Sequence, residues 1–396
     1  MTDIDKSSSV KRKLAVFHNL PSGGGINAAA SMIRGISDRF SITVHSPGGS
    51  SLFSVPGLIQ TREWPFPSSS RITGIRRFAA PFLLSARLRA FDRLCRKIAD
   101  EINRTADLAL VFNSMYVAAP PLLQYLEVPS LYFCYEYPRH LYEPDLVRRT
   151  SNRIYHLLLR HLRKIERIKD RKAVLSADKV VTLSSWMKKR LRDIYGIESL
   201  IVRPGIDTEF FRADKITGKS NMVLSVGALW PFKGHEMAIE TIAEIDADIR
   251  PSLTIVADRK YPGYEQKLEQ LAAKLGVVLN IMKNISNEDL RDTYRTSMAV
   301  LCCQHNEPYG LVLLEAMSCG IPVIAVKEGG FLDNIKNGEN GIFVNRDPVE
   351  MAAALNDVLS DGVLREKLST GGRYFAITKR SSAEAAASLA KILNNN

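Results

Sequence analysis

The sequence predicts an α/β protein built from two doubly wound domains, each with a parallel sheet. In the second half, short apolar runs that suit buried strands alternate with amphipathic helical patterns, which indicates right-handed crossovers between parallel strands. The same alternation opens the first half with the apolar run 14–18. A length of 396 residues also favours two domains over one.

The composition is that of a soluble globular protein, with 45% hydrophobic and 24% charged residues. Five cysteines, an odd number without metal-ligand spacing, suit a reducing compartment, where most of them would be small buried groups. No apolar run approaches the roughly 20 residues of a membrane span, and residues 1–10 lack the apolar core of a signal peptide. We therefore expect a cytoplasmic protein.

The net charge of +12 is concentrated in the first half of the chain. Residues 1–200 contain 32 Lys and Arg against 17 Asp and Glu, whereas the remainder contains 22 against 25. This asymmetry predicts an anionic partner for the first half, such as a membrane surface, a lipid phosphate, an acidic polymer or a nucleic acid. A solubilising basic surface is the alternative. No aromatic-interleaved or known nucleic-acid module accompanies the charge, so no nucleic acid is expected.

The first half begins with a predicted strand at 14–18, a glycine loop at 19–25 and a helix from about Asn27 to Ile36. Glycine at this point of a doubly wound fold lets a phosphate approach the backbone. Because Gly23-Gly24-Gly25 lacks the spacing of a dinucleotide fingerprint, a turn without a ligand carries equal weight. Further strands are predicted at 41–45, 107–112, 130–134, 179–183 and 200–203.

A Ser-, Gly- and Pro-rich segment at 49–75 reads as a long loop that could close over a site. Two basic amphipathic helices are predicted, one over 81–103 and one over 147–175. Such helices either lie on an anionic membrane or pack their apolar stripe on the sheet.

In the second half, strands are predicted at 222–226, 252–257, 277–282, 298–303 and 322–326. Helices are predicted at about 235–245, 263–275, 287–296, 311–319, 348–359, 361–370 and 382–394. The resulting domain prediction is a disordered terminus at 1–10, an N-terminal Rossmann-like domain at 11–205, a linker at 206–220, a C-terminal Rossmann-like domain at 221–378, and a C-terminal helix at 379–396 that can pack back on the N-terminal domain. Ligands would lie in a cleft between the two domains.

The stretch 305–324 carries the strongest functional signal. It reads as a turn and a short helix between two buried strands, with Glu307 in the turn and Glu315 in the helix. A helix that starts at the carboxyl end of a parallel strand offers free N–H groups and a partial positive charge to an anion. Two carboxylates beside such a helix start indicate a ligand with both phosphate and hydroxyl groups. A sugar nucleotide fits this description.

A second loop, Gly227 to Gly234, follows the first strand of the second half and contains Lys233. A lysine at this position can neutralise a diphosphate, although for this motif alone a surface lysine before a helix is the favoured interpretation. Gly329-Gly330 forms a glycine turn that could hold a phosphate or sugar hydroxyls. The sequence shows no metal-ligand cluster, and His235 and His305 read as incidental.

Taken together, these motifs resemble family-4 retaining glycosyltransferases of the GT-B fold, also called glycosyl transferases group 1. The matching residues are Gly227, Lys233-Gly234, Glu307-Pro-Tyr-Gly with Glu315 eight positions on, Gly329-Gly330 and Asn337-Gly-Glu-Asn-Gly341. The resemblance covers most of 12–394 and is stronger in the second half.

The resemblance implies a role for each motif. Glu307 would contact hydroxyls of the transferred sugar, Glu315 would contact the ribose, and Lys233 would hold the diphosphate together with backbone N–H groups. The implied donor-binding set is Gly24, Gly25, Gly227, Lys233, Ile285, Glu307, Tyr309, Gly310, Leu311 and Glu315, and the implied catalytic set is Glu307, Lys233 and Tyr135. No metal and no cofactor are expected beyond the donor, a GDP- or UDP-linked sugar.

Two positions depart from the family pattern. Ala228 stands where members usually have arginine, and Tyr135 stands where many have histidine. The first departure removes a cation from the diphosphate; Arg139, Arg259 or Lys260 could replace it. The second replaces a base by a group that only donates a hydrogen bond near neutral pH.

The predicted function is therefore a metal-independent retaining glycosyltransferase that moves a sugar to a glycan or lipid-linked acceptor, in the synthesis of a surface polysaccharide or glycolipid. A peripheral position on the inner face of the membrane is compatible with the basic first half. A non-catalytic sugar-nucleotide-binding subunit of a glycosylation complex is the alternative, favoured by Ala228 and Tyr135.

Overall fold

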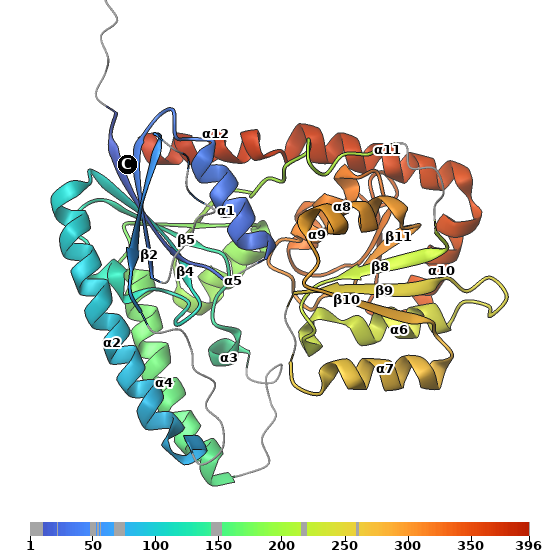
Figure 1. The fold of residues 1–396 in the computed structure, drawn as a ribbon, viewed down its shortest axis with the longest axis horizontal. Helices are drawn as coiled ribbons and strands as arrows, with labels where there is room; N and C mark the ends of the chain where they lie inside the picture. Colours follow the sequence, from blue (N-terminus) through green and yellow to red (C-terminus); the bar gives the residue numbers. More distant parts are fainter. Residues whose placement is uncertain are drawn as a thin grey trace, which may run out of the picture.

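A computed structural model describes residues 11–21, 23–47, 53, 55, 57–66, 76–143, 153–214, 220–258 and 261–395, and it describes side chains in these ranges except at 76–85 and 153–161. The predicted disorder of residues 1–10 and the predicted roles of Arg259 and Lys260 lie outside the described residues. Two parallel sheets form the body, one in each half of the chain (Figure 1).

Within the described residues, the N-terminal sheet has the order β3-β2-β1-β4-β5-β6-β7. Its strands are β1 Lys13–Asn19, β2 Ser41–Pro47, β3 Ile59–Trp64, β4 Leu108–Ser114, β5 Ser130–Cys134, β6 Lys179–Thr182 and β7 Leu200–Ile201. The C-terminal sheet has the order β10-β9-β8-β11-β12-β13. Its strands are β8 Met222–Val226, β9 Ser252–Ala257, β10 Leu279–Lys283, β11 Ala299–Cys302, β12 Val323–Val326 and β13 Ile342–Val344. All neighbouring strands are parallel, which confirms the predicted α/β doubly wound class.

Helices connect and cover these strands. The helices are α1 Gly24–Arg34, α2 Arg76–Thr105, α3 Arg139–Tyr142, α4 Arg153–Leu175, α5 Ser185–Tyr195, α6 His235–Ala243, α7 Tyr264–Leu275, α8 Asn287–Thr296, α9 Leu311–Ser318, α10 Pro348–Ser360, α11 Gly362–Lys379 and α12 Ser382–Asn394. In the second half, the helices predicted up to 319 agree closely with α6 to α9. The helices α6 to α8 are amphipathic and α9 is mostly apolar. All four contribute apolar residues to the core, so the local pattern was enough to locate them.

The structure corrects the predicted loop at 49–75, since part of it is the edge strand β3. This strand pairs with β2 on one side only, and four of its six residues are exposed. An edge strand with charged and polar side chains lacks the apolar run that identifies a buried strand. The helix predicted at 361–370 is also longer than expected, because α11 continues to Lys379.

The C-terminal end of the chain returns to the N-terminal half. Figure 1 shows α11 above the C-terminal sheet and α12 beside α1 on the N-terminal half, and α1 and α12 are in direct contact. Their approach is close at Gly35, where an added Cβ would lie 2.6 Å from the Cβ of Ala386. The backbone at Ile206 pairs with Ser381, so the linker and the returning segment cross side by side.

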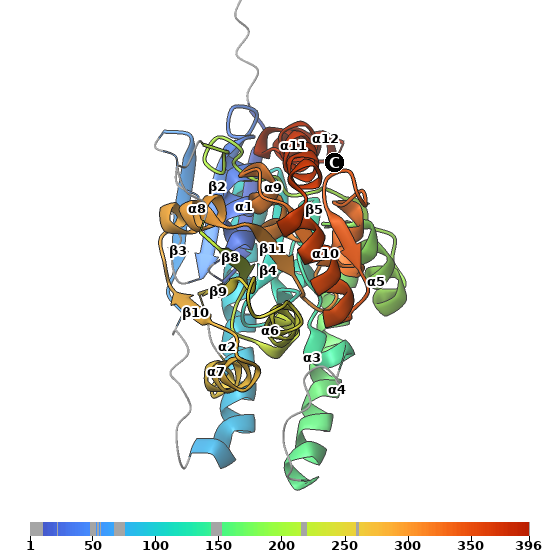
Figure 2. The same cartoon turned by 90° about the vertical axis from the view of Figure 1, so that its right-hand side faces the viewer.

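The long helices α2 and α4 extend past the N-terminal sheet in the same direction (Figures 1 and 2). From Phe91 onward the apolar stripe of α2 is buried, with Phe91, Ile98 and Ile102 fully inaccessible. The stripe of α4 is different, because Ile165 and Ile168 are 40% and 60% exposed. No described helix is long and apolar enough to cross a membrane.

Candidate active site

The candidate site lies at the carboxyl ends of β8 and β11, which are neighbours at the point where the C-terminal sheet reverses its strand order. In open α/β sheets this switch point is where loops leave a crevice for a ligand. The loop after β8 contains Gly227 and Lys233, and the turn after β11 contains Glu307. The fold therefore brings the two sequence motifs to one place.

Lys233 and Glu307 form an ion pair, with Lys233 Nζ 2.8 Å from Glu307 Oε2. Both side chains are partly exposed, 23% and 20%, so a ligand can reach them. The aliphatic part of Lys233 passes over Gly227, where an added Cβ would lie 3.4 Å from Lys233 Cδ. Gly227 has φ +156°, a conformation that side chains rarely adopt. The side chain of Lys233 thus extends over Gly227 to reach Glu307.

His235, at the start of α6, orders the loop on which Lys233 lies. Its Nε2–H donates to the carbonyl oxygens of Gly227 (3.2 Å) and Ala228 (3.3 Å), and in the neutral ring Nδ1 accepts from the Ser225 hydroxyl (3.0 Å). Burial lowers the pKa of His235 to about 4, so the ring is neutral at physiological pH. His235 is therefore a structural residue of the loop and is not exposed to a ligand.

The Glu307 turn is held from its own domain by the glycine turn 329–333. The backbone N–H of Gly330 donates to the Glu307 carbonyl at 2.6 Å. An added Cβ at Gly329 would lie 2.5 Å from the same carbonyl oxygen, so only glycine fits at this contact. Gly329-Gly330 was predicted to hold a phosphate or hydroxyls; in the structure these two residues pack against the Glu307 turn.

The turn is also held from the opposite domain, by Arg139 of α3. Its guanidinium donates to the carbonyl oxygens of His305 (2.9 Å) and Asn306 (2.5 Å) and pairs with Glu136 (2.5 Å). Burial lowers the pKa of Arg139, but the carboxylates of Glu136 and Glu307 outweigh this effect and the pKa is raised. Three cations were considered for the place left by Ala228, and of these Arg139 lies in the described part of the chain, where it faces the Glu307 turn.

The helix α9 starts directly after this turn. Gly310 precedes it in a left-handed conformation (φ +96°), and an added Cβ would lie 2.7 Å from the ring of Phe331. The position therefore requires glycine for both space and conformation. The first N–H groups of α9, from Leu311 on, have no partner inside the helix and point towards the carboxyl edge of the sheet.

Glu315 lies one turn further along α9 and faces the N-terminal half. Its Oε2 accepts a hydrogen bond of 2.8 Å from the hydroxyl of Tyr294 on α8. An added Cβ at Gly24, the first residue of α1, would lie 3.2 Å from Leu311 Cδ1 and 3.9 Å from Glu315 Oε1. Burial raises the pKa of Glu315 to about 7, although the Tyr294 hydrogen bond opposes this. We call this contact between the start of α1 and α9 the interdomain seam.

Tyr135 lies at the N-terminal side of the site, directly after β5. Its ring packs near Gly25, where an added Cβ would be 3.6 Å away, and its buried hydroxyl has no hydrogen-bond partner among the described residues. The hydroxyl of Tyr309 is likewise buried and unpartnered. Burial raises the pKa of both phenols, and each remains a neutral donor at physiological pH.

The structure thus brings most of the predicted site residues together in two groups. Lys233, Gly227 and Glu307 form one group, and Gly24, Leu311 and Glu315 form the other at the interdomain seam. Ile285 is half-buried and packs at the edge of the C-terminal core. Among the described residues, no three His, Cys, Asp or Glu side chains gather as metal ligands.

Tyr294 is a residue that the sequence did not point to. Its contact with Glu315, 21 residues further along the chain, joins the helices α8 and α9. A lone tyrosine in an amphipathic helix has no signal that separates it from an ordinary core residue, and only the packing of α8 against α9 reveals its partner.

A comparison with known protein families matches the part of the chain that contains Lys233, Glu307 and Glu315. The model of the family "Glycosyl transferases group 1" matches residues 207–375. Residues 207–375 are thus similar to the glycosyl transferases group 1 family. The matched range contains Lys233, Glu307 and Glu315, and it starts at the linker. The predicted resemblance is therefore confirmed for the half of the chain in which its motifs were strongest.

Curated relatives match about half of the chain. A D-inositol 3-phosphate glycosyltransferase from Geodermatophilus obscurus is 33% identical over 231 residues, which are 53% of this chain and 51% of that protein. A second one, from Acidothermus cellulolyticus, is 32% identical over 50% of this chain and 49% of its own. The matches thus span about half the length of these relatives.

Solved structures match over nearly the whole chain. Sucrose-phosphate synthase from Thermosynechococcus elongatus has a TM-score of 0.76 at 16% identity, covering 97% of this chain and 99% of its own. Anabaena HepE, in complex with UDP and glucose, has a TM-score of 0.72 at 16% identity and covers 97% and 100%. WaaG, a glycosyltransferase involved in lipopolysaccharide biosynthesis, has a TM-score of 0.71 at 19% identity and covers 97% and 100%. The predicted GT-B fold, with two Rossmann-like domains, is confirmed.

Proposed function

We propose that the protein is a retaining glycosyltransferase that moves a sugar from a GDP- or UDP-linked donor to a glycan or lipid-linked acceptor. The observation that carries the proposal is the Lys233–Glu307 pair at the switch point of the C-terminal sheet, on one side of the α9 helix start. Glu315 lies on the other side, facing Gly24 of the opposite domain. A cation, a helix start and two carboxylates match the diphosphate and hydroxyl groups of a nucleotide sugar.

In this proposal each group has one task. Lys233 and the N–H groups at Gly310 and Leu311 hold the diphosphate, Glu307 accepts hydroxyls of the transferred sugar, and Glu315 accepts those of the ribose. Lys233 currently pairs with Glu307, so a diphosphate would become its second anionic neighbour. Because the charge on the leaving diphosphate grows as the glycosidic bond breaks, a fixed lysine stabilises the transition state more than the ground state.

The reaction needs no metal in this proposal, because Lys233 and the helix start supply the positive potential. The acceptor hydroxyl attacks the anomeric carbon from the face that the diphosphate leaves. The bond to the diphosphate oxygen breaks, the bond to the acceptor oxygen forms, and the acceptor proton passes to the leaving diphosphate. The configuration at the anomeric carbon is retained. Tyr135, a buried neutral phenol, would donate a hydrogen bond to a sugar hydroxyl and would not act as a base.

A panel of nucleotide sugars tests the proposal. We expect tight binding of a GDP- or UDP-linked sugar, slow donor hydrolysis without an acceptor, and transfer with extracts that contain glycan or lipid-linked acceptors. Glu307→Ala should abolish transfer. Binding without turnover, with Glu307→Ala changing only affinity, would favour the non-catalytic subunit; absence of binding would contradict both functions.

We further propose that the N-terminal half associates with the inner face of an anionic membrane, as expected for the synthesis of a surface polysaccharide or glycolipid. The exposed Ile165 and Ile168 of α4 support this, because Arg163, Lys164 and Lys169 lie on the same helix. Each basic residue near an anionic surface contributes about 1 kcal/mol.

Flotation with vesicles separates this membrane role from a solubilising surface. The protein should float with anionic vesicles and much less with neutral ones, and Ile165→Ser with Ile168→Ser should weaken flotation. The control pair is Ile249→Ser with Val278→Ser, which changes exposed apolar residues of the other half. Equal recovery with neutral vesicles would exclude electrostatic attachment.

A further inference from the structure

The two oxygens of Glu315 have different surroundings. Oε2 accepts the hydrogen bond from the buried hydroxyl of Tyr294, at 2.8 Å. Oε1 faces the interdomain seam, 3.9 Å from the place of an added Cβ at Gly24. Within the described part of the chain Oε1 has no hydrogen bond. One oxygen is therefore fixed and the other is turned to the place where the donor would lie.

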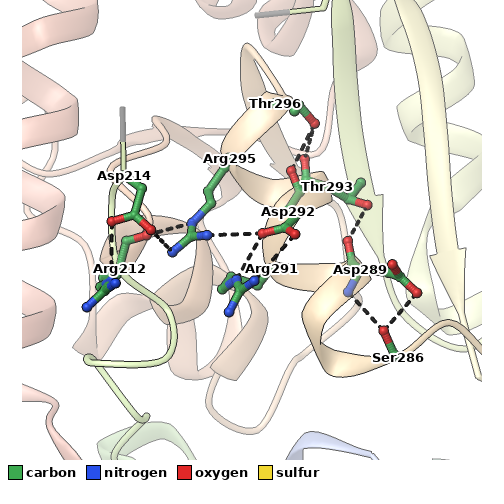
Figure 3. Close-up of polar contacts among 9 residues, drawn as sticks. All are labelled: Arg212, Asp214, Ser286, Asp289, Arg291, Asp292, Thr293, Arg295 and Thr296. Atoms are coloured by element: carbon green, nitrogen blue, oxygen red, sulfur yellow. Dashed lines mark hydrogen bonds and ion pairs between the residues drawn. The ribbon is translucent and has the colours of Figure 1, made fainter. Parts of the chain in front are cut away.

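The helix that carries Tyr294 is itself fixed, as Figure 3 shows. The next residue, Arg295, has a side chain only 8% exposed; it pairs with Asp214 (2.8 Å) and Asp292 (3.0 Å) and donates to the Arg212 carbonyl (2.8 Å). These contacts tie α8 to the end of the linker segment. Because a buried, multiply bonded arginine resists movement, the position of α8 is well defined.

The ring of Tyr294 is held as well. It is fully buried and packs edge-to-face on Phe211, with ring centroids 6.1 Å apart. Ser318, at the end of α9, donates its hydroxyl proton to the Phe211 carbonyl. The linker residue Phe211 thus contacts both helices, and the distance between the Tyr294 hydroxyl and Glu315 is set by packing on a common residue.

We propose that Tyr294 is a positioning residue for donor binding: its hydroxyl holds Glu315 so that Oε1 accepts a ribose hydroxyl of the nucleotide. The inference rests on the proposed function, in which Glu315 binds the ribose. Tyr294 does not touch the donor and acts only through Glu315.

The charge of Glu315 makes this role measurable. Burial raises its pKa to about 7, and the Tyr294 hydrogen bond lowers it. Two thiols lie near Glu315 and Tyr294, those of Cys302 on β11 and Cys319 after α9, and burial raises the pKa of both well above neutral. The guanidinium groups of Arg291, Arg295 and Arg373 act on Cys319 and stay charged throughout this pH range. The thiols remain uncharged, so Tyr294 is the described group that favours the ionised carboxylate. Without its hydroxyl, Glu315 would be protonated at a higher pH and would accept ribose hydroxyls less well.

Nucleotide affinity as a function of pH provides the test. UDP and GDP are titrated between pH 6 and 9, and the tighter ligand is followed in Tyr294→Phe, which keeps the packing on Phe211. The matched control is Tyr264→Phe, since Tyr264 is a buried tyrosine of the same domain that donates to Glu236 and not to Glu315. Wild-type affinity should fall as the pH drops below about 7. In Tyr294→Phe we expect about tenfold weaker binding at pH 7, with recovery to within about twofold at pH 9.

Two further measurements separate positioning from a merely structural role. Glu315→Gln should bind with no pH dependence near neutrality, and a 2′,3′-dideoxynucleoside diphosphate should bind wild type and Tyr294→Phe equally. A loss of affinity in Tyr294→Phe that is equal at every pH, or no loss, would overturn the inference. Absence of nucleotide binding in wild type would instead overturn the proposed function.

Discussion

Glu315 is a carboxyl group that the folded protein holds in an unfavourable place. Its pKa is raised by burial to about 7, against 4.5 for an ordinary glutamate. A folded-state pKa above the unfolded value means that the folded state binds the proton more tightly. The free energy of unfolding therefore falls as the pH rises from about 4.5 to about 7.

Replacing this carboxyl group by an amide should stabilise the protein in a pH-dependent way. Glu315→Gln keeps an oxygen for Tyr294 and removes the charge, so we expect a gain of about 3 kcal/mol at pH 8 that vanishes below about pH 4.5. Denaturant unfolding at both pH values measures the difference. The control is Glu288→Gln, an exposed glutamate at the start of α8. A gain in Glu315→Gln that is the same at both pH values would show that burial of the charge is not the cause.

At the scale of single residues, site residues that lie in one local motif could be predicted from the sequence. Contacts between residues of distant segments could not. Glu307 and Glu315 stand on one turn and helix, so their spacing alone located them beside a helix start. The contact of Tyr294 with Glu315 and that of His235 with the Gly227 carbonyl depend on how separate elements pack, and the local sequence does not show this packing.

At the scale of elements, the loop between β8 and α6 depends on one glycine. Gly234 has φ +71°, and an added Cβ would lie 2.1 Å from the Cys303 carbonyl oxygen. Here the backbone of the Lys233 loop touches the end of β11, so the glycine fixes the lysine relative to the Glu307 turn. Glycine is required at 234 both for the positive φ and for the close contact with Cys303, and neither requirement can be seen in the sequence.

A pair of substitutions separates these two sources. Gly263 has nearly the same conformation, φ +75°, but an added Cβ would meet nothing within 4 Å. We expect Gly263→Ala to cost about 1 kcal/mol of unfolding free energy, for conformation alone. Gly234→Ala should cost about 3 kcal/mol or more, because the backbone must also move away from Cys303. Thermal unfolding of both variants measures the two losses of stability. Equal losses would mean that the Lys233 loop moves away from Cys303 without a further cost in free energy.

At the level of single strands, the sequence pattern predicted positions where apolar residues predominate and missed a strand whose side chains are mostly polar. The strands β8, β9, β11 and β12 of the C-terminal sheet are rich in apolar residues, and the predicted ranges for β8 and β9 coincide with those of the structure. The edge strand β3 has mostly exposed side chains and was mistaken for a loop. The limits proposed for the two domains and the linker stay predictions.

At the scale of the whole molecule, polar contacts join the two halves around the site. Arg139 binds the Glu307 turn from one side, and Ser184 Oγ donates to the Pro308 carbonyl at 2.7 Å. Arg203 pairs with Asp333 at 2.7 Å. Such contacts between residues more than 100 positions apart could not be predicted from the sequence, because they depend on how the two sheets are placed.

Arg139 should therefore stabilise the opposite domain. Arg139→Ala leaves two backbone carbonyls without their donor, and we expect a local loss of about 1–3 kcal/mol. Hydrogen exchange of the amides at 305–311 should become faster. The control is Arg190→Ala, because Arg190 pairs with Glu143 inside its own half. Unchanged exchange at 305–311 in Arg139→Ala would mean that the turn is held from its own domain alone.

The central claim is that Lys233 stabilises a departing nucleoside diphosphate. The most direct test is single-turnover transfer from the donor that wild type binds, measured at saturating donor in wild type, Lys233→Ala and the control Lys267→Ala. Lys267 is a half-exposed lysine of the same domain that pairs with Glu236. The account predicts a rate about 10²–10³ lower in Lys233→Ala and an unchanged rate in Lys267→Ala. Equal rates in wild type and Lys233→Ala, or no turnover in wild type despite donor binding, would contradict it.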